Sequence, residues 1–255
     1  YKNVPVYFIG IVVFSALIYL SIPMFFNYDK LKLENTACKD LNVKCTIKGK
    51  VRYSFFPTPR IKIKDLIIQD FVDKKKILGK IDNVAVKLSL YNLSDKSKLN
   101  FTKLELQNAE INFELRELKE YRNFFKKKFN SKSINLKKGE IKFFDGTKSV
   151  AVIRDVNFKY KTSKNTNEVI LKGNFLNDDI YINLKNKKNE NNLSTMFILK
   201  FFDINTKINV SNLDLDKNII SGNVSFEKNK NRLTSIFDYK DDKIIFKQAN
   251  LRNTF

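Results

Sequence analysis

Apolar residues recur at every second position through most of the chain after Ile77, as in Val84, Val86, Leu88 and Leu90. This alternation is typical of β-strands with one apolar and one polar face, because successive side chains of a strand point to opposite faces. Further stripes are Leu104 and Leu106; Ile111, Phe113 and Leu115; Ile141 and Phe143; Val150 and Val152; Val156, Phe158 and Tyr160; Val169 and Leu171; and Ile180, Ile182 and Leu184. Polar turn signals such as Asp145-Gly146 separate these stripes and predict a long antiparallel β-meander.

An antiparallel sheet with one apolar face must cover that face or offer it to an apolar ligand. The sequence predicts two short helices, at 28–40 and at 115–130, and the second either covers the sheet or lies on a membrane surface. Two such helices are too small to cover the whole meander. The sheet therefore either closes into a sandwich or barrel, or stays open as a curved sheet or groove, and periodicity alone leaves both possibilities open.

The segment Val4 to Phe26 is a run of 23 residues without a charged side chain. As a helix at about 1.5 Å per residue it spans roughly 34 Å, enough to cross a bilayer core. A cleaved signal peptide is the alternative, but the sequence SIPMFFNYD offers no small-residue cleavage site. We predict an uncleaved transmembrane anchor at 1–27. Because the chain starts with Tyr and ends abruptly, we expect it to continue beyond both ends.

The segment 46–71 contains two expected strands joined by a stiff corner, because proline fixes its own φ and has no N–H for a sheet ladder. The alternating residues before the corner are Val51, Tyr53 and Phe55; the corner is Phe56-Pro57-Thr58-Pro59; and the alternating residues after it are Ile61 and Ile63. After Asp65 the apolar positions shift to Leu66 and Ile68, which predicts a bulge.

These elements together resemble the N-terminal signature of the AsmA family of bacterial envelope proteins. The matching features are a membrane helix, a short polar helix, a strand ending in Gly, and a strand ending in an F-P-x-P corner at Phe56, Pro57 and Pro59. The resemblance covers 4–90 and continues as a strand pattern to about 184. Two departures are Leu41-Asn42, where the family has Gly, and the pair Cys38 and Cys45. The resemblance implies a single-pass protein of the bacterial inner membrane, with 28–255 as a periplasmic AsmA-like β domain.

The AsmA family is itself similar to chorein-type proteins, in which repeated β elements form a long groove for lipid acyl chains. The resemblance therefore implies that the chain carries phospholipid between inner and outer membranes and supports outer-membrane biogenesis. The expected groove residues are Val84, Val86, Leu88, Leu90, Ile111, Phe113, Ile141, Phe143, Phe158, Ile180 and Ile182, although each can equally be ordinary core. The alternative is a non-enzymatic scaffold or assembly factor that binds outer-membrane proteins.

Cys38 and Cys45 have six residues between them, at the end of the expected short helix and the start of the first strand. In an oxidising periplasm they can form a disulfide that staples the helix to the strand. They can equally be two unrelated buried thiols.

The net charge of +21 comes from Lys residues spread along the expected strands. A solvated strand face, attraction to anionic lipid and a nucleic-acid partner all fit a basic chain, but no nucleic-acid-binding motif accompanies the charge. The chain has no His, and it lacks a recognisable carboxylate pair or a G-x-S-x-G motif. We therefore predict no enzymatic activity, no cofactor, no metal site and no nucleic-acid partner.

Overall fold

The computed structural model describes residues 4–39, 43–121, 132–188, 193–214, 219–240 and 243–253. The fold is mainly β, with antiparallel strands that do not close into a barrel and with an apolar helix at the N-terminus, so the predicted fold class is confirmed. The chain divides into two compact units. Unit 1 comprises Tyr1–Lys132 and Phe144–Thr147, and unit 2 comprises Ser133–Phe143 and Lys148–Phe255.

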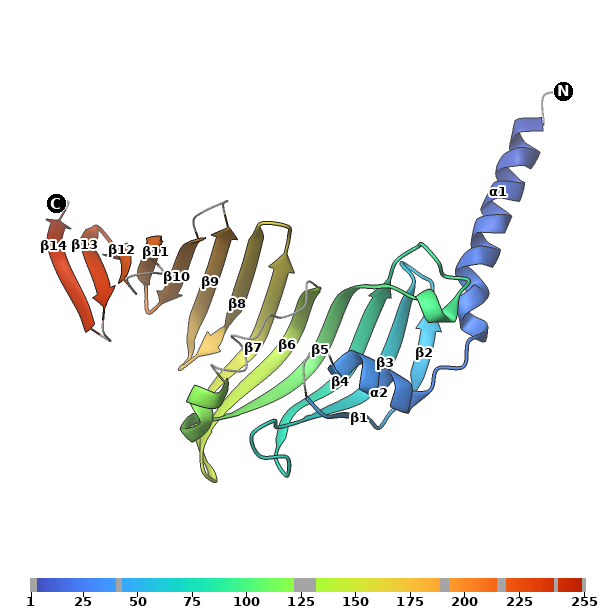
Figure 1. Cartoon of the computed structure of the whole chain (residues 1–255), viewed down its shortest axis with the longest axis horizontal. Helices are drawn as coiled ribbons and strands as arrows, with labels where there is room; N and C mark the ends of the chain where they lie inside the picture. Colours follow the sequence, from blue (N-terminus) through green and yellow to red (C-terminus); the bar gives the residue numbers. More distant parts are fainter. Residues whose placement is uncertain are drawn as a thin grey trace. The chain divides into compact units, whose positions relative to one another are not determined.

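Unit 1 contains the described helices and the first strands (Figure 1). Its helical elements are α1 (Val4–Ser21), the short 3-10 helix η1 (Ile22–Phe25), α2 (Lys30–Lys39), η2 (Lys96–Lys98) and η3 (Leu115–Glu117). Its strands are β1 (Cys45–Ile47), β2 (Val51–Ser54), β3 (Arg60–Gln69), β4 (Ile77–Leu88) and β5 (Phe101–Glu114). They pair in the order β1-β3-β4-β5, with β2 also on β3. The helix expected at 28–40 is therefore present as α2.

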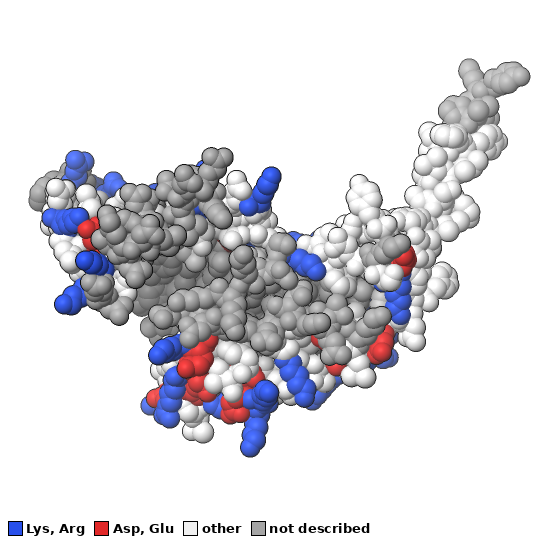
Figure 2. Space-filling model, viewed as in Figure 1, with Lys and Arg blue, Asp and Glu red and all other residues white. Residues whose placement is uncertain are grey.

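The N-terminal helix contains an apolar span, Tyr7–Phe25, that is long enough to cross a membrane and is only 6% buried. In Figure 2 the rod of α1 carries no Lys or Arg along its described length. This composition matches the predicted transmembrane anchor.

One face of the unit 1 sheet is apolar and forms the core. Ile63 pairs with Val84, and Val84 pairs with Leu106 on the next strand, so apolar side chains from three strands lie side by side. Ile63 and Val84 are only 3% exposed. The opposite face carries charge: Glu105 lies 3.5 Å from Arg60, 3.0 Å from Lys87 and 3.3 Å from Lys103, measured between the charged nitrogen and oxygen atoms.

The apolar positions of β3 change parity at Asp65, as predicted, and this residue has a left-handed backbone with φ 55°. Lys64 and Asp65 are both exposed, and Asp82 and Asn83 opposite them are exposed too. The pairing of β3 with β4 keeps its register across this point, so no extra residue is inserted and the bulge predicted there is absent from this strand pair. Asp and Asn tolerate the left-handed region better than most residues, which makes a change of parity possible without Gly.

A left-handed residue inside the strand also occurs in two other strands, and it corrects the number of strands predicted there. The stripes at Leu104 to Leu106 and at Ile111 to Phe113 belong to one strand, β5, with a left-handed Asn108 (φ 53°) between them, and Leu115 lies outside it in η3. Strand β7 (Lys148–Thr162) likewise runs through a left-handed Asp155 (φ 51°). Alternation is interrupted at such a residue, which is why the sequence predicts too many strands.

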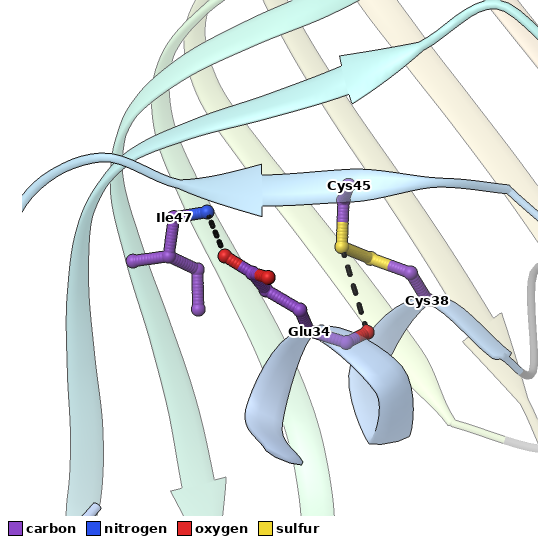
Figure 3. Close-up of a disulfide and its surroundings, with 4 residues drawn as sticks. All are labelled: Glu34, Cys38, Cys45 and Ile47. Atoms are coloured by element: carbon purple, nitrogen blue, oxygen red, sulfur yellow. Dashed lines mark hydrogen bonds between the residues drawn. A yellow bond between two sulfur atoms is a disulfide. The ribbon is translucent and has the colours of Figure 1, made fainter. Parts of the chain in front are cut away.

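Segments outside the strands cover the apolar face of unit 1. Cys45 and Ile47 lie on that face opposite Ile68 and Leu66, and Cys45 is joined to Cys38 of α2 by a disulfide (Figure 3). The Glu34 carboxylate of α2 also accepts a hydrogen bond from the backbone N–H of Ile47. Of the two alternatives for the cysteines, a disulfide or two unrelated thiols, the structure has the disulfide. This bond holds α2 over β1.

A second cover begins after β5, where the sequence predicted a helix at 115–130. The described part consists of η3 and helical residues 118–121, and the rest of the predicted helix lies outside the described residues. Tyr121 is 3% exposed, and its ring makes edge-to-face contacts with Phe71 and Phe113, each with 5.2 Å between ring centroids.

Unit 2 is a meander of neighbouring antiparallel strands. They are β6 (Ser133–Asp145, whose last two residues belong to unit 1), β7, β8 (Thr166–Phe175), β9 (Asp178–Lys188), β10 (Leu193–Phe201), β11 (Ile204–Asp214), β12 (Ile219–Lys228), β13 (Asn231–Lys240) and β14 (Lys243–Asn253). Between residues 133 and 253, the described residues form strands and turns, and none of them lies in a helix.

Candidate functional site

The face of unit 2 that carries Phe158 is apolar from strand to strand. A first row of paired residues crosses eight strands: Phe158, Leu171, Ile182, Leu199, Thr206, Phe226, Leu233 and Leu251. A second row, two residues further along each strand, consists of Tyr160, Val169, Leu184, Phe197, Ile208, Val224, Ser235 and Ala249. We call these two rows the unit 2 apolar face. With about 4.8 Å between strands, each row is roughly 34 Å long.

Most side chains of the unit 2 apolar face are neither buried nor fully exposed. Among the described apolar side chains of β8 to β14, Val224 is the only one that is buried, at 6% exposed. In the first row the exposed fraction reaches 41% at Phe226, 39% at Leu233 and 74% at Leu251. An exposed apolar surface of this extent is uncommon on a soluble domain and is typical of interaction surfaces and ligand-binding grooves.

The opposite face of the same strands is polar and basic. Lys172 and Lys200 lie on either side of Tyr181, with their Nζ atoms 5.7 Å and 5.9 Å from its ring centroid. Lys161 makes an ion pair of 3.7 Å with Glu168. The Lys residues of this region are therefore part of a solvated strand face, which was one of the three interpretations of the net charge. The two faces differ enough that an apolar ligand can use only one of them.

Strand β14 is the last strand of the sheet in the described part of the chain, where it pairs with β13. Its side chains from Lys243 to Arg252 are exposed, including Ile244, Ile245, Phe246 and Leu251.

The predicted groove residues fall into three groups in the structure. Val84, Leu88 and Ile141 are buried, with exposed fractions of 3%, 5% and 9%. Partly exposed side chains are found at Val86, Ile111, Phe113, Phe143, Phe158, Ile180 and Ile182. Leu90 does not continue the stripe: β4 ends at Leu88, and Leu90 lies in the following loop with its side chain 58% exposed. This corrects the predicted stripe, which ends where Ser89 donates its backbone N–H to Asn100 in the loop.

The prediction omitted residues beyond Leu184 that the structure places on the same face. Phe197 and Leu199 pair with Leu184 and Ile182, and Ile208 continues the second row. The alternation of Phe197, Leu199 and Phe201 was a signal that could have identified them.

Unit 1 has a separate cleft of about 360 Å³ at the far end of its sheet, away from α1. Its lining includes Lys75, Lys76, Lys80, Phe113 and Glu114. A hydrogen bond from the backbone N–H of Gly146 (3.1 Å) lowers the pKa of Glu114, and Lys76, 3.4 Å away, lowers it further. Below the cleft, the buried Tyr121 hydroxyl donates to Asp70 at 2.8 Å, and burial with this bond raises the pKa of Tyr121.

The side chains of Asp70, Tyr121 and Glu114 are fixed by hydrogen bonds within this network, which indicates a structural role. Tyr121 also accepts the backbone N–H of Glu114 (3.3 Å). A continuous chain of hydrogen bonds therefore joins Asp70, Tyr121, Glu114 and Gly146. The network fixes the end of β5 to the connection between β3 and β4. We therefore regard the unit 2 apolar face, rather than this cleft, as the candidate functional site.

Comparison of the sequence with protein-family models and with curated proteins finds no match.

Proposed function

We propose that this chain is an AsmA-like carrier of phospholipid, anchored in the bacterial inner membrane by α1, with residues 28–255 in the periplasm. Acyl chains lie against the unit 2 apolar face while their head groups remain in water. The lipid moves between inner and outer membranes and supports outer-membrane biogenesis. The carrier acts by binding alone and uses no catalytic residue or cofactor.

The observation that carries this proposal is the unit 2 apolar face, which crosses eight strands and is only partly buried. Burial of a methylene group contributes about 0.8 kcal/mol to binding. On the unit 2 apolar face an acyl chain is covered on one side only, so each methylene contributes a fraction of that value. Because Ile, Leu, Val and Phe make up most of the two rows, the binding free energy changes little from strand to strand. A chain held on such a surface can slide without a deep minimum.

Two further features support the proposal. The span Tyr7–Phe25 is long and apolar enough to hold the chain at a membrane, where phospholipid is available. The order of elements from α1 to β3, including the corner at Phe56, Pro57 and Pro59, resembles the AsmA family.

The test uses the neighbouring residues Leu171 and Ile170 of β8, which point to opposite faces. Leu171 pairs with Phe158 and Ile182 on the apolar face, whereas Ile170 pairs with Lys159 and Asn183 on the other. The photoreactive residue benzoylphenylalanine is incorporated at one position or the other in the full chain, and native membranes are irradiated. We expect phospholipid adducts, identified by mass spectrometry, at Leu171 and not at Ile170. Equal adducts at both positions, or none at Leu171, contradict the proposal.

A matched pair of charged variants separates lipid binding from folding. Leu171→Glu places a carboxylate on the apolar face, and Ile170→Glu places the same group on the polar face. We expect both variants to keep the parent's thermal transition, and only Leu171→Glu to abolish lipid adducts at a reporter at Phe197. Unfolding of Leu171→Glu would show that the face is a closed core.

The unit 2 apolar face also suits a second candidate function, an assembly factor for outer-membrane proteins. Apolar side chains of a client protein can lie against this face as acyl chains do. Benzoylphenylalanine at Leu171 distinguishes the two functions, because protein adducts there support the assembly factor and lipid adducts support the carrier.

A further inference from the structure

Five large apolar side chains are exposed around the end of α1 in unit 1. They are Met24, Phe25, Phe56, Leu90 and Tyr91, with exposed fractions of 56%, 86%, 76%, 58% and 80%. Three different segments supply them: η1, the β2–β3 connection and the β4–β5 connection. We call this group the foot patch. In Figure 1 both connections lie at the end of the unit 1 strands that is nearest to α1.

Hydrogen bonds fix these connections beside the last turn of α1. The Tyr19 hydroxyl donates to the Leu90 carbonyl at 2.9 Å and accepts the backbone N–H of Leu93 at 3.2 Å. The Tyr53 hydroxyl of β2 donates to the Leu20 carbonyl at 2.7 Å. Leu93 is completely buried, so its connection is packed in place and not only hydrogen-bonded.

The position of Tyr19 sets the depth of the foot patch relative to a membrane. Tyr19 and Leu20 belong to the apolar span Tyr7–Phe25, whose end lies six residues beyond Tyr19. The two α-helical and four 3-10 residues that follow Tyr19 correspond to about 11 Å along the axis. When the span crosses a bilayer, the connection at Leu90 therefore lies at the level of the span's last turns rather than above the membrane.

The chemistry of the β4–β5 connection changes with this depth. Leu90 and Tyr91 are at the level of Tyr19, whereas Lys96, further along the connection, donates its Nζ to the carbonyl of Asn27, beyond the end of the span. Aromatic side chains prefer the boundary between acyl chains and head groups, and Lys prefers the head groups above it. The order from apolar to basic is the order that a bilayer interface requires.

We infer that the foot patch is inserted in the interface of the same bilayer that α1 crosses, so that unit 1 is held against the lipid surface by its loops as well as by its helix. The partner is the phospholipid interface itself. The inference rests on the anchor in the proposed function and is independent of lipid carriage. Its physical basis is that hydrogen bonds join α1 to the β4–β5 connection and to β2, the strand that leads into the connection with Phe56.

The chain contains no Trp, so a single introduced Trp reports on one position. Tyr91→Trp places it in the foot patch, and Val72→Trp places it on the β3–β4 connection at the opposite end of the strands, where Val72 is 40% exposed. Phe14→Trp, in the middle of α1, is the control for the anchor. Each full-length variant is reconstituted into phosphatidylcholine vesicles whose acyl chains are brominated, and Trp quenching is measured.

We expect strong quenching for Phe14→Trp, and quenching of Tyr91→Trp that exceeds that of Val72→Trp by at least about twofold, as for aromatic groups at an interface. Phe56→Trp should behave like Tyr91→Trp. If Phe14→Trp is quenched but Tyr91→Trp and Phe56→Trp match Val72→Trp, the foot patch lies in water and the inference is wrong while the anchor stands. If Phe14→Trp is also unquenched, the anchor and the inference both fail.

Discussion

The two units use the same alternating pattern but differ in what lies on their apolar faces. In unit 1 the face at Ile63 and Val84 is buried, and α2, held by Cys38, and the turn that carries Tyr121 lie over parts of it. In unit 2 the side chains of β6 and β7 such as Ile141 and Val156 are buried, whereas the face at Leu171 and Ile182 is partly exposed, and no described residue of that unit lies in a helix. Period-two alternation therefore determines which side chains share a face, and what packs on that face determines whether it becomes a core.

The largest expected difference comes from placing a charge on each apolar face. Ile63→Asp puts a carboxylate at a buried site without a partner, and we expect a loss of at least about 4 kcal/mol in the unfolding free energy of unit 1. Ile182→Asp puts the same group where water reaches it, and we expect a much smaller loss in unit 2. Hydrogen exchange of peptides from each unit, measured in detergent micelles, checks both. Equal losses in the two units would mean that unit 2 also has a closed core.

The next effect concerns the disulfide that holds α2 over the sheet of unit 1. The bond closes a short loop, and its removal by Cys38→Ser with Cys45→Ser should destabilise unit 1 by roughly 2 to 3 kcal/mol through the entropy of the unfolded chain. Hydrogen exchange should increase at α2 and β1 and stay unchanged in unit 2. Labelling of both thiols in unreduced, denatured parent protein would show that the bond is absent in the native chain.

The sequence predicted the strands and their apolar faces because alternation is a local property. It identified the parity change at Asp65, where the corner and both strands were already assigned, but missed the same change at Asn108 and Asp155. A left-handed Asn or Asp inside a strand has no distinctive sequence signal beyond the interrupted period. The cover of unit 1 depends on contacts such as Tyr121 with Phe71, between residues 50 positions apart, and periodicity contains no information about them.

A smaller effect should come from the Tyr121 hydroxyl, which connects the cover of unit 1 to its sheet. Tyr121→Phe leaves the buried Asp70 without its hydroxyl donor, which typically costs about 1 to 3 kcal/mol. The pKa of Tyr121 is raised in the folded state, so its contribution is complete below the ordinary tyrosine value of about 10 and is lost as the pH rises further. We expect parent unit 1 to lose stability in strong alkali, and Tyr121→Phe to show less of this loss. An unchanged alkaline profile in the variant would assign the loss to other groups.

The smallest effect compares the charged faces of the two units. Burial alone would raise the pKa of Glu105, but its hydrogen bonds to Lys87 and Lys103 and their charges outweigh this, and the pKa is lowered. Its contribution to unit 1 is therefore present above the ordinary glutamate value of about 4.3 and is lost on acidification below it. Glu105→Gln should lower the unfolding free energy by at most about 1 kcal/mol, because the group is partly exposed to solvent.

Glu168 in unit 2 is the matched control, because among the described residues it forms an ion pair with the exposed Lys161 alone, beside a 3.5 Å hydrogen bond from the Asn183 amide. Glu168→Gln should change stability by only a few tenths of a kcal/mol, as is usual for one ion pair with an exposed Lys. Added salt should weaken the effect of Glu105→Gln less than that of Glu168→Gln, since three cations hold Glu105 at 3.0 to 3.5 Å whereas the Lys161 charge at 3.7 Å from Glu168 is exposed and readily screened. Thermal melts of both variants at low and high ionic strength measure this difference. If the two substitutions have equal effects, the charged face of unit 1 is no better organised than that of unit 2, and the contrast between the units is confined to their apolar faces.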